Sequence, residues 1–374
     1  HKNFNFECRF RAMLGNSGKN VADEIGNGFP HLPAGCHIKL EKQAQRYILE
    51  NIRNSIYNGR SSQLVSRVAT FTNESGLPLT LANFVEYHHL NLHDIYKRVS
   101  FARLCEKAHA QPAFAAPDEK RLTNGLRRIL HLNSAYQLQT LLRILQGAFE
   151  QLTSMEERLL TMLHFSLWGK DSGISSLQES VERLKANGPF FDELLDVLRY
   201  LYEHTDIVTE RPELPYESPL ELHASYTRDE ILAALGNWTF NSTPECREGV
   251  KYLPALETDL FLITLNKAEK HYSPTTMYLD YAISDDLFHW QSQSTTSVES
   301  PTGQRYLNQR QTGNTILLFV REDKSHHGQS NAYCFLGPAE YVSHNGSRPI
   351  NIEWRLKYKM PARLCRMTER MATA

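Results

Sequence analysis

The spacing of apolar residues predicts a helical region over residues 40–205. Apolar side chains recur there three and four positions apart, which places them on one face of a helix. Two such stripes are Leu138, Leu141, Leu142, Leu145 and Phe149, and Phe191, Leu194, Leu195, Leu198, Leu201 and Tyr202. Ser154 and Glu157 have the spacing of a capping box, and Asn187-Gly188-Pro189 separates two helices. The pattern indicates a multi-helix bundle.

A second pattern, with a period of two residues, fills the last third of the chain. Two apolar runs are typical of strands buried on both faces, and in two others apolar and polar residues alternate. The first two are residues 260–265 and 315–320, and the others are 277–283 and 350–358. In the run 277–283 the alternation turns Asp280 away from the apolar side. Several short strands so close together predict a small barrel or sandwich.

Residues 206–222 separate the two patterns and contain three prolines among acidic residues, which is typical of an inter-domain linker. Thr227 and Glu230 then have capping-box spacing before a short helix. We therefore predict an α+β protein, with an N-terminal multi-helix bundle followed by a small β-rich barrel- or sandwich-like domain. The expected parts are a connecting segment (1–40), a helical domain (41–205), the linker (206–222) and a β-rich C-terminal domain (223–374).

Composition places the chain among ordinary globular proteins. Its 374 residues are 41% hydrophobic and 22% charged, with a formal net charge of −1. No run is long and apolar enough to span a bilayer, and the first residues lack the order of a signal peptide. We therefore expect a cytoplasmic protein with no membrane partner. The six cysteines form no C-x-x-C pair, which favours reduced thiols over a zinc ribbon.

The charge is unevenly distributed along the chain. Lys and Arg outnumber Asp and Glu in residues 1–150 and 301–374, and the reverse holds between them. A basic segment is suited to contact with phosphates, although a solvated charged face gives the same pattern. The chain starts at His1 rather than at Met, from which we expect a piece of a longer protein.

Two patterns resemble known ligand sites but lack required residues. The run Gly15-Asn16-Ser17-Gly18-Lys19 lacks the earlier glycine and the following Ser or Thr of a Walker loop. His89 and His93, beside His88, would share a face if helical, but no third zinc ligand is evident. We therefore expect no metal site and no cofactor in this segment.

The run Phe288-His289-Trp290-Gln291-Ser292-Gln293 is the strongest candidate for contact with a ligand. In a strand, Phe288 and Trp290 point one way, while the polar side chains between and after them point the other way. The amides of Gln291 and Gln293 can pair with a base edge, and Trp290 can stack on a base. The run predicts a nucleic-acid-binding surface, with a packed strand that has a polar outer face as the alternative.

Basic residues of the same region add candidate contacts. Arg305 and Arg310 lie in a polar stretch between the expected strands, and Arg321, Arg355 and Lys357 follow. Arginine and lysine suit contact with phosphates and bases. An exposed loop has the same composition, so both interpretations stay open.

Asp280 is the one candidate for a catalytic group. Its spacing to Gln291-x-Gln293 resembles the metal-binding Asp and Glu-x-Lys of a restriction-type nuclease, but the second carboxylate and the lysine are absent. Such nucleases need clustered carboxylates to hold Mg²⁺. A degenerate nuclease site at Asp280 therefore remains an alternative hypothesis.

Residues 218–366 resemble the C-terminal domain of certain bacterial superfamily 2 helicases. The resemblance rests on Ser218-Pro219-Leu220, Phe288-His289-Trp290-Gln291-Ser292-Gln293, Phe335-Leu336-Gly337 and Ile352-Glu353-Trp354-Arg355-Leu356. Those proteins commonly carry a phospholipase D-like nuclease domain, then a DEAD/DEAH-type ATPase core, then this tail. Residues 3–11 and 29–36 resemble the chain that follows the last helicase motif in the same proteins.

The resemblance implies that residues 1–40 are the end of a helicase core, which is the expected partner in the parent chain. ATP and Mg²⁺ are then expected only upstream of His1. The segment itself is expected to bind DNA, or to regulate the ATPase, in genome defence or repair. A protein-interaction scaffold is the further alternative, and the oligomeric state stays open.

Overall fold

The computed structural model describes residues 61–97, 99–147, 151–240, 246, 249–266, 280–326, 329–361 and 364. The chain divides into two compact units. The first includes residues 61–79, 83–99 and 103–112, and the second includes residues 80–82, 100–102 and those from 113 onward. The predictions for residues 1–40, including the run from Gly15 to Lys19, lie outside the described residues.

Short helices make up the described part of the first unit. They are α4 (Ser61–Glu74), α6 (Leu92–Tyr96) and most of α5 (Leu81–Tyr87) and α7 (Phe101–Lys107). The Phe71 ring packs edge to face against Phe84 and Tyr87, with ring centroids 6.1 and 5.3 Å away. These apolar contacts hold α4 against α5.

The predicted cluster of His88, His89 and His93 does not share one helical face. His89 has a φ angle of 50°, which ends the turn after α5, and His93 belongs to α6. His88 Nε2 lies 3.0 Å from the backbone oxygen of Arg67, so this ring is held by the backbone. Among the described residues no group of three metal-ligating side chains is found.

The predicted helical region is confirmed in the second unit. Its helices are α8 (Glu119–Arg128), α9 (Ala135–Gln146), α10 (Ser154–Trp168), α11 (Leu177–Lys185) and α12 (Pro189–Glu203). α10 is buried all round from Leu159 to Trp168, as expected of a central helix. Its capping box is formed by Thr153 and Glu156, one residue before the predicted pair.

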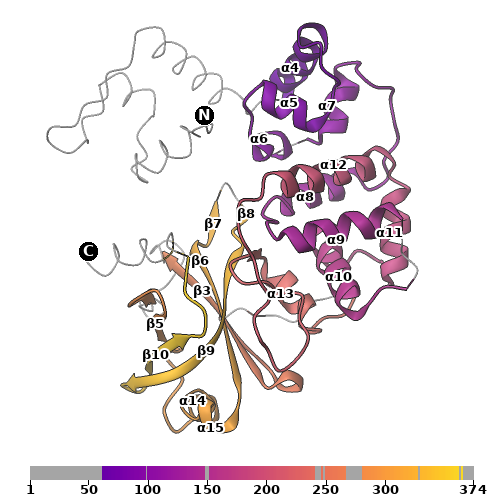
Figure 1. Cartoon of the computed structure of the whole chain (residues 1–374). Coiled ribbons are helices and arrows are strands. Elements are labelled where there is room, and N and C mark those ends of the chain that lie inside the picture. The colour runs from indigo at the N-terminus through magenta and orange to yellow at the C-terminus, as the bar shows by residue number, and fades with distance from the viewer. Residues whose placement is uncertain are drawn as a thin grey trace, which may run out of the picture. The chain divides into compact units, whose positions relative to one another are not determined.

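The predicted β-rich region is also confirmed, and its eight-stranded sheet is mixed and not closed. The elements are β1 (Ser225–Tyr226), α13 (Arg228–Ala234), β2 (Val250–Leu253), η1 (Pro254–Leu256), β3 (Thr258–Asn266), β4 (Tyr281–Ala282), β5 (Leu287–Gln291), α14 (Pro301–Leu307), α15 (Gln309–Thr312), β6 (Thr315–Asp323), β7 (Ser325–His326), β8 (Gln329–Ser330), β9 (Tyr333–Asn345) and β10 (Asn351–Leu356). The strand order is β2-β3-β6-β9-β10-β5-β4, with β1 beside β9. Figure 1 labels β3, β6, β9, β10 and β5 of this sheet. Only β3 and β6 pair in parallel. β7 and β8 form a separate pair.

One face of the sheet carries the main core. Apolar side chains of β3, β5, β6, β9 and β10 meet there, together with Tyr306 of α14. β3 and β6 are buried on both faces, as their apolar composition predicts. β10 instead alternates, with Ile352, Trp354 and Leu356 in the core and the residues between them outside it.

The helical part and the sheet meet at buried carboxylates. Glu230 of α13 lies 2.7 Å from His131 Nε2 and accepts a 2.8 Å hydrogen bond from the Ser166 hydroxyl. Glu221 accepts hydrogen bonds from the hydroxyls of Ser134 and Thr209. The predicted linker 206–222 therefore lies inside the second unit.

Candidate nucleic-acid interface

Alternation along β5 separates an apolar side from a polar side, as the sequence predicts. Phe288 and Trp290 are buried in the core, where Trp290 packs edge to face against Tyr306 with ring centroids 5.5 Å apart. His289 and Gln291 point to the opposite side and are half-buried. The strand thus presents two adjacent polar side chains away from α14.

The neighbouring strand extends this polar side. β10 is antiparallel to β5, with Glu353 opposite His289 and Asn351 opposite Gln291. Directly opposed residues lie close enough to act together. We call the outward polar side chains of these two strands the polar face: His289, Gln291, Asn351, Glu353 and Arg355.

Contacts with neighbouring side chains fix the orientation of the side chains on the polar face. The Tyr281 ring of β4 stacks on His289 with centroids 4.6 Å apart and planes 14° from parallel. The Gln291 amide donates a 3.0 Å hydrogen bond to Asn351 Oδ1. Glu353 accepts a 2.9 Å bond from the Ser343 hydroxyl. Held in this way, the donors and acceptors lose little conformational freedom when a ligand binds.

Basic side chains lie at the edge of the polar face and are paired with carboxylates. Arg355, Lys357 and Arg310 are 51%, 46% and 55% exposed. Their partners are Asp286 at 2.8 Å, Glu213 at 2.6 Å and Glu340 at 3.2 Å. The hydrogen bond from Lys357 raises the pKa of that amine and lowers the pKa of Glu213. Exposed ion pairs of this kind contribute little to stability, so these cations can exchange their partner for a phosphate.

Several predicted contacts do not lie on the polar face. Trp290 stacks on Phe261 inside the core with ring centroids 4.1 Å apart, so its ring offers no surface to a base. Arg321 is buried and donates to Thr264 and Asn331. Arg305 is bound to Asp259. The sequence shows that these side chains are polar or aromatic, but not which partners the fold gives them.

Gln293 also lies outside the row of polar side chains. β5 ends at Gln291, and the Gln293 carbonyl accepts a hydrogen bond from Thr296 N in the turn that follows. The alternation of inward and outward side chains therefore ends at Gln291, two residues earlier than predicted. Gln293 is half-buried beyond the end of the strand.

Asp280 has a structural role in this fold. Its side chain is 8% exposed, and Oδ1 accepts a 3.0 Å hydrogen bond from Gln291 N. Ala282, not Tyr281, packs in the core, so the alternation expected for this segment is reversed. The carboxylate ties the start of β4 to the end of β5, and among the described residues no group of three metal-ligating side chains includes it.

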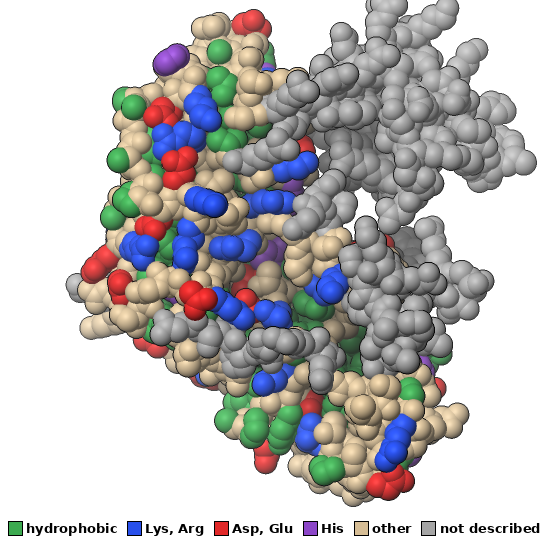
Figure 2. All heavy atoms as spheres, turned by 180° about the vertical axis from the view of Figure 1, so that it is seen from behind, with side chains coloured by type: hydrophobic (Ala, Val, Ile, Leu, Met, Phe, Trp, Pro, Cys, Tyr) green, Lys and Arg blue, Asp and Glu red, His purple; other side chains and the backbone are tan. Residues whose placement is uncertain are grey.

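A second cluster of charged residues surrounds the end of α10, which the sequence did not indicate. Figure 2 shows Lys and Arg side chains gathered on one face over the helical part of the second unit. Arg121 donates to the backbone oxygens of Trp168 and Asp171, and Arg128 donates to those of Ser166 and Leu167. Cations at this position complement the negative end of the helix dipole.

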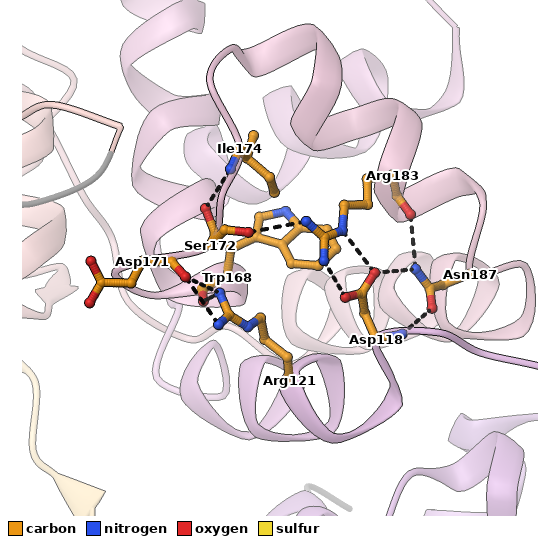
Figure 3. Close-up of polar contacts among 8 residues, drawn as sticks. All are labelled: Asp118, Arg121, Trp168, Asp171, Ser172, Ile174, Arg183 and Asn187. Carbon is orange, nitrogen blue, oxygen red and sulfur yellow. Dashed lines mark hydrogen bonds and ion pairs between the residues drawn. The ribbon is translucent and has the colours of Figure 1, made fainter.

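Arg183 completes this cluster, as Figure 3 shows. Its guanidinium forms two hydrogen bonds with Asp118 and lies over the Trp168 ring, 5.3 Å from the centroid. The hydrogen bond from Arg183 lowers the pKa of Asp118. These arginines donate to backbone oxygens at the end of α10 and in the loop that follows it, so we interpret the cluster as a structural clamp.

Comparison with protein families places the polar face in a recognised domain. Residues 220–367 match the family described as a domain of unknown function, DUF3427. The match includes the sheet, α13 and α14, and begins after α12. No curated protein matches the chain. None of the described helices is both long and apolar enough to cross a membrane.

Proposed function

We propose that this chain is a DNA-recognition module and that the polar face of β5 and β10 is its contact surface. Gln291 and Asn351 would bind base edges, and Arg310, Arg355 and Lys357 would bind phosphates. Strands of a β-sheet can contact a groove of DNA, where amide side chains can distinguish bases.

The observation that carries the proposal is the register of β5 and β10. It places His289 and Gln291 beside Glu353 and Asn351 on the side of the sheet away from the core. The solvated face of a sheet is polar in any case, but here the donors and acceptors are also held in fixed orientations by their neighbours. Mixed polar groups with cations around them are typical of contact with both bases and phosphates.

The sequence resemblance supports DNA as the ligand and suggests a setting. If the parent protein is a superfamily 2 helicase, recognition by this module would direct or regulate an ATPase core. ATP and Mg²⁺ would then be bound by that core. Genome defence and repair are the processes in which such a module would act.

Binding of the full chain to labelled duplex, forked and single-stranded DNA over a range of salt concentrations tests the proposal. We expect binding that weakens with salt, because phosphate contacts release counterions. Gln291→Ala should weaken it about tenfold, since a base contact of this kind contributes roughly 1–3 kcal/mol. Gln178→Ala is the matched control, because that exposed glutamine of α11 bonds only within its helix, to Glu182.

The cations are tested in the same assay. Arg310→Ala should weaken binding to all sequences equally and lower its salt dependence. Arg199→Ala is the control, because Arg199 forms an equally exposed pair with Asp196 on α12. A folded chain that binds none of these DNAs at low salt would overturn the proposal and favour a protein-interaction scaffold.

A further inference from the structure

Asp259 and Arg305 form a polar site on the other side of the sheet from the polar face. Arg305 lies on α14, whose Tyr306 packs in the core beside Trp290. Asp259 is the second residue of β3 and is 1% exposed. The two residues are 46 positions apart in the chain, and the fold brings them into direct contact.

The carboxylate fixes the plane of the guanidinium. Arg305 Nε donates to Asp259 Oδ2 at 2.7 Å, and Nη2 donates to Oδ1 at 2.9 Å. Asn314 Nδ2 donates a further 2.9 Å bond to Oδ2. The Tyr252 ring covers the guanidinium, with its centroid 3.9 Å from Cζ. Hydrogen bonds and stacking together leave Arg305 one orientation.

The outer edge of the same guanidinium is left for another partner. A guanidinium has five N–H donors, and Asp259 accepts from two of them. The Tyr306 hydroxyl accepts one further hydrogen bond from the same guanidinium, and the Arg305 side chain is 22% exposed. Asn314 Oδ1 in the same cluster is buried and has no hydrogen-bond partner among the described residues. Asp259 thus accepts three hydrogen bonds, whereas two N–H donors of Arg305 are left for a ligand.

We infer that Arg305 binds two coplanar acceptors of a nucleotide through Nη1 and Nη2, and that Asp259 and Tyr252 are positioning residues for this contact. Guanine O6 and N7 form such a pair, as do two phosphate oxygens. The inference rests on the proposed function and adds a second contact, on the opposite side of the sheet. Because Asp259 neutralises the charge of Arg305, this side chain attracts DNA only weakly over a distance. Its contribution to binding therefore comes from the directed hydrogen bonds of the guanidinium.

Arg305→Lys tests the inference in the full chain, because lysine keeps the charge but cannot form the planar two-point contact. We expect DNA binding to weaken about tenfold or more. Arg199→Lys, which alters an exposed paired arginine elsewhere, should leave binding within about twofold. Tyr252→Ala should weaken binding in the same way, whereas Tyr252→Phe, which keeps the ring, should not. The tyrosine variants leave the pair of Asp259 and Arg305 in place and so guard against a folding defect.

A duplex in which 7-deazaguanine replaces guanine separates the two acceptors. If the wild-type chain loses affinity for it and Arg305→Lys does not lose more, guanine is the ligand. If the wild type ignores the replacement and Arg305→Lys weakens binding to every sequence, phosphate is the ligand. Folded Arg305→Lys and Tyr252→Ala chains that bind all duplexes like the wild type would overturn the inference.

Failure of the inference is distinguishable from failure of the proposed function. Loss of binding in Gln291→Ala without loss in Arg305→Lys leaves the polar face as the DNA surface and removes Arg305. If no duplex binds, thermal unfolding with deoxyguanosine monophosphate decides. If deoxyguanosine monophosphate raises the unfolding midpoint of the wild type but not that of Arg305→Lys, the Arg305 site is supported without the polar face. If the wild-type midpoint does not rise, the Arg305 site is rejected.

Discussion

His164 shows how strongly burial changes the chemistry of one side chain. It is 1% exposed on α10, with its ring packed edge to face against Phe165 and Phe240. Its only described hydrogen bond joins Nδ1 and the Ser180 hydroxyl over 2.9 Å. Burial lowers the pKa of His164 to about 4. The neutral ring is therefore the form that packs in the folded protein.

Stability should fall as the pH is lowered from about 6.5 to about 4. Over this range the unfolded state binds a proton at His164 and the folded state does not, so the lowered pKa favours unfolding by up to about 3 kcal/mol. Chemical unfolding at a series of pH values measures this. In His164→Gln the decrease should be smaller, whereas His204→Gln, which alters an exposed histidine, should behave like the wild type. Equal slopes in all three proteins would contradict the prediction.

The side of the sheet on which a residue lies was predictable from the sequence where apolar and polar residues alternate along a strand. The alternation at 288–291 gave the correct side of the sheet for Phe288, Trp290 and Gln291. The burial of the Trp290 ring against Phe261 was not predicted, because it depends on a strand far away in the sequence. The polar partners Asn351 and Glu353 were visible as the outward positions of a strand, but their register with β5 was not.

At the scale of elements, α14 lies close against the sheet because Gly303 has no side chain. A Cβ atom at this position would lie 2.0 Å from the Ser297 backbone oxygen and 3.2 Å from Ile350 Cδ1. Ser300 caps the helix by accepting from Gly303 N at 3.1 Å. The close approach sets where Tyr306 enters the core and where Arg305 meets Asp259.

Gly303→Ala should therefore destabilise the protein by about 1–3 kcal/mol, as overpacked sites do. Urea unfolding of the full chain gives the value. The control is Gly147→Ala, because a Cβ atom there would have no neighbour within 4 Å. If Gly303→Ala and Gly147→Ala had equal free energies of unfolding, α14 would be able to shift and accommodate the methyl group without loss of stability.

Elements with strong local signals were predicted, but the side of the sheet on which the residues of β4 lie was not. Thr227 and Glu230 form the expected capping box, and on α10 the box was displaced by one residue because Thr153 and Ser154 are both suitable caps. β4 has only two residues, too few for the alternation around Asp280 to set its register. Pairing with β5 sets it instead.

At the scale of the whole molecule, the junction at Glu230 joins the helical part to the sheet. Burial opposes charge on His131 and Glu230, but their mutual attraction raises the pKa of His131 and lowers that of Glu230. The carboxylate also accepts hydrogen bonds from Ser166 and Thr227. This pair links the helical part of the chain to the β-rich part. The sequence pattern had separated these two parts at residues 206–222.

Glu230→Gln should lower the free energy of unfolding by about 1–3 kcal/mol, since it leaves a buried network partly unsatisfied. The difference should shrink as the pH rises, because His131 has a raised pKa and loses its proton there, so the wild type loses the ion pair. Glu182→Gln, on the exposed side of α11, is the control. A pH-independent difference would show that charge does not act at this junction.

A fragment that starts at residue 206 should unfold at a lower temperature than the full chain. It keeps Glu221 and Glu230 but loses His131, Ser134 and Ser166, which leaves each of these two buried carboxylates with fewer hydrogen-bond partners. Calorimetry of both proteins measures the difference. A fragment as stable as its counterpart in the full chain would show that the sheet folds independently.

The distance in sequence between the two halves of the Glu230 junction has a consequence during synthesis. His131 is made 99 residues before Glu230, and ribosomes add about 5–20 residues per second. The docking side of the helical part therefore waits roughly 5–20 s for its acidic partner. Throughout that interval its surface is open to chaperones and proteases, so the rate of translation through the proline-containing segment before Glu230 sets how long the nascent chain is vulnerable.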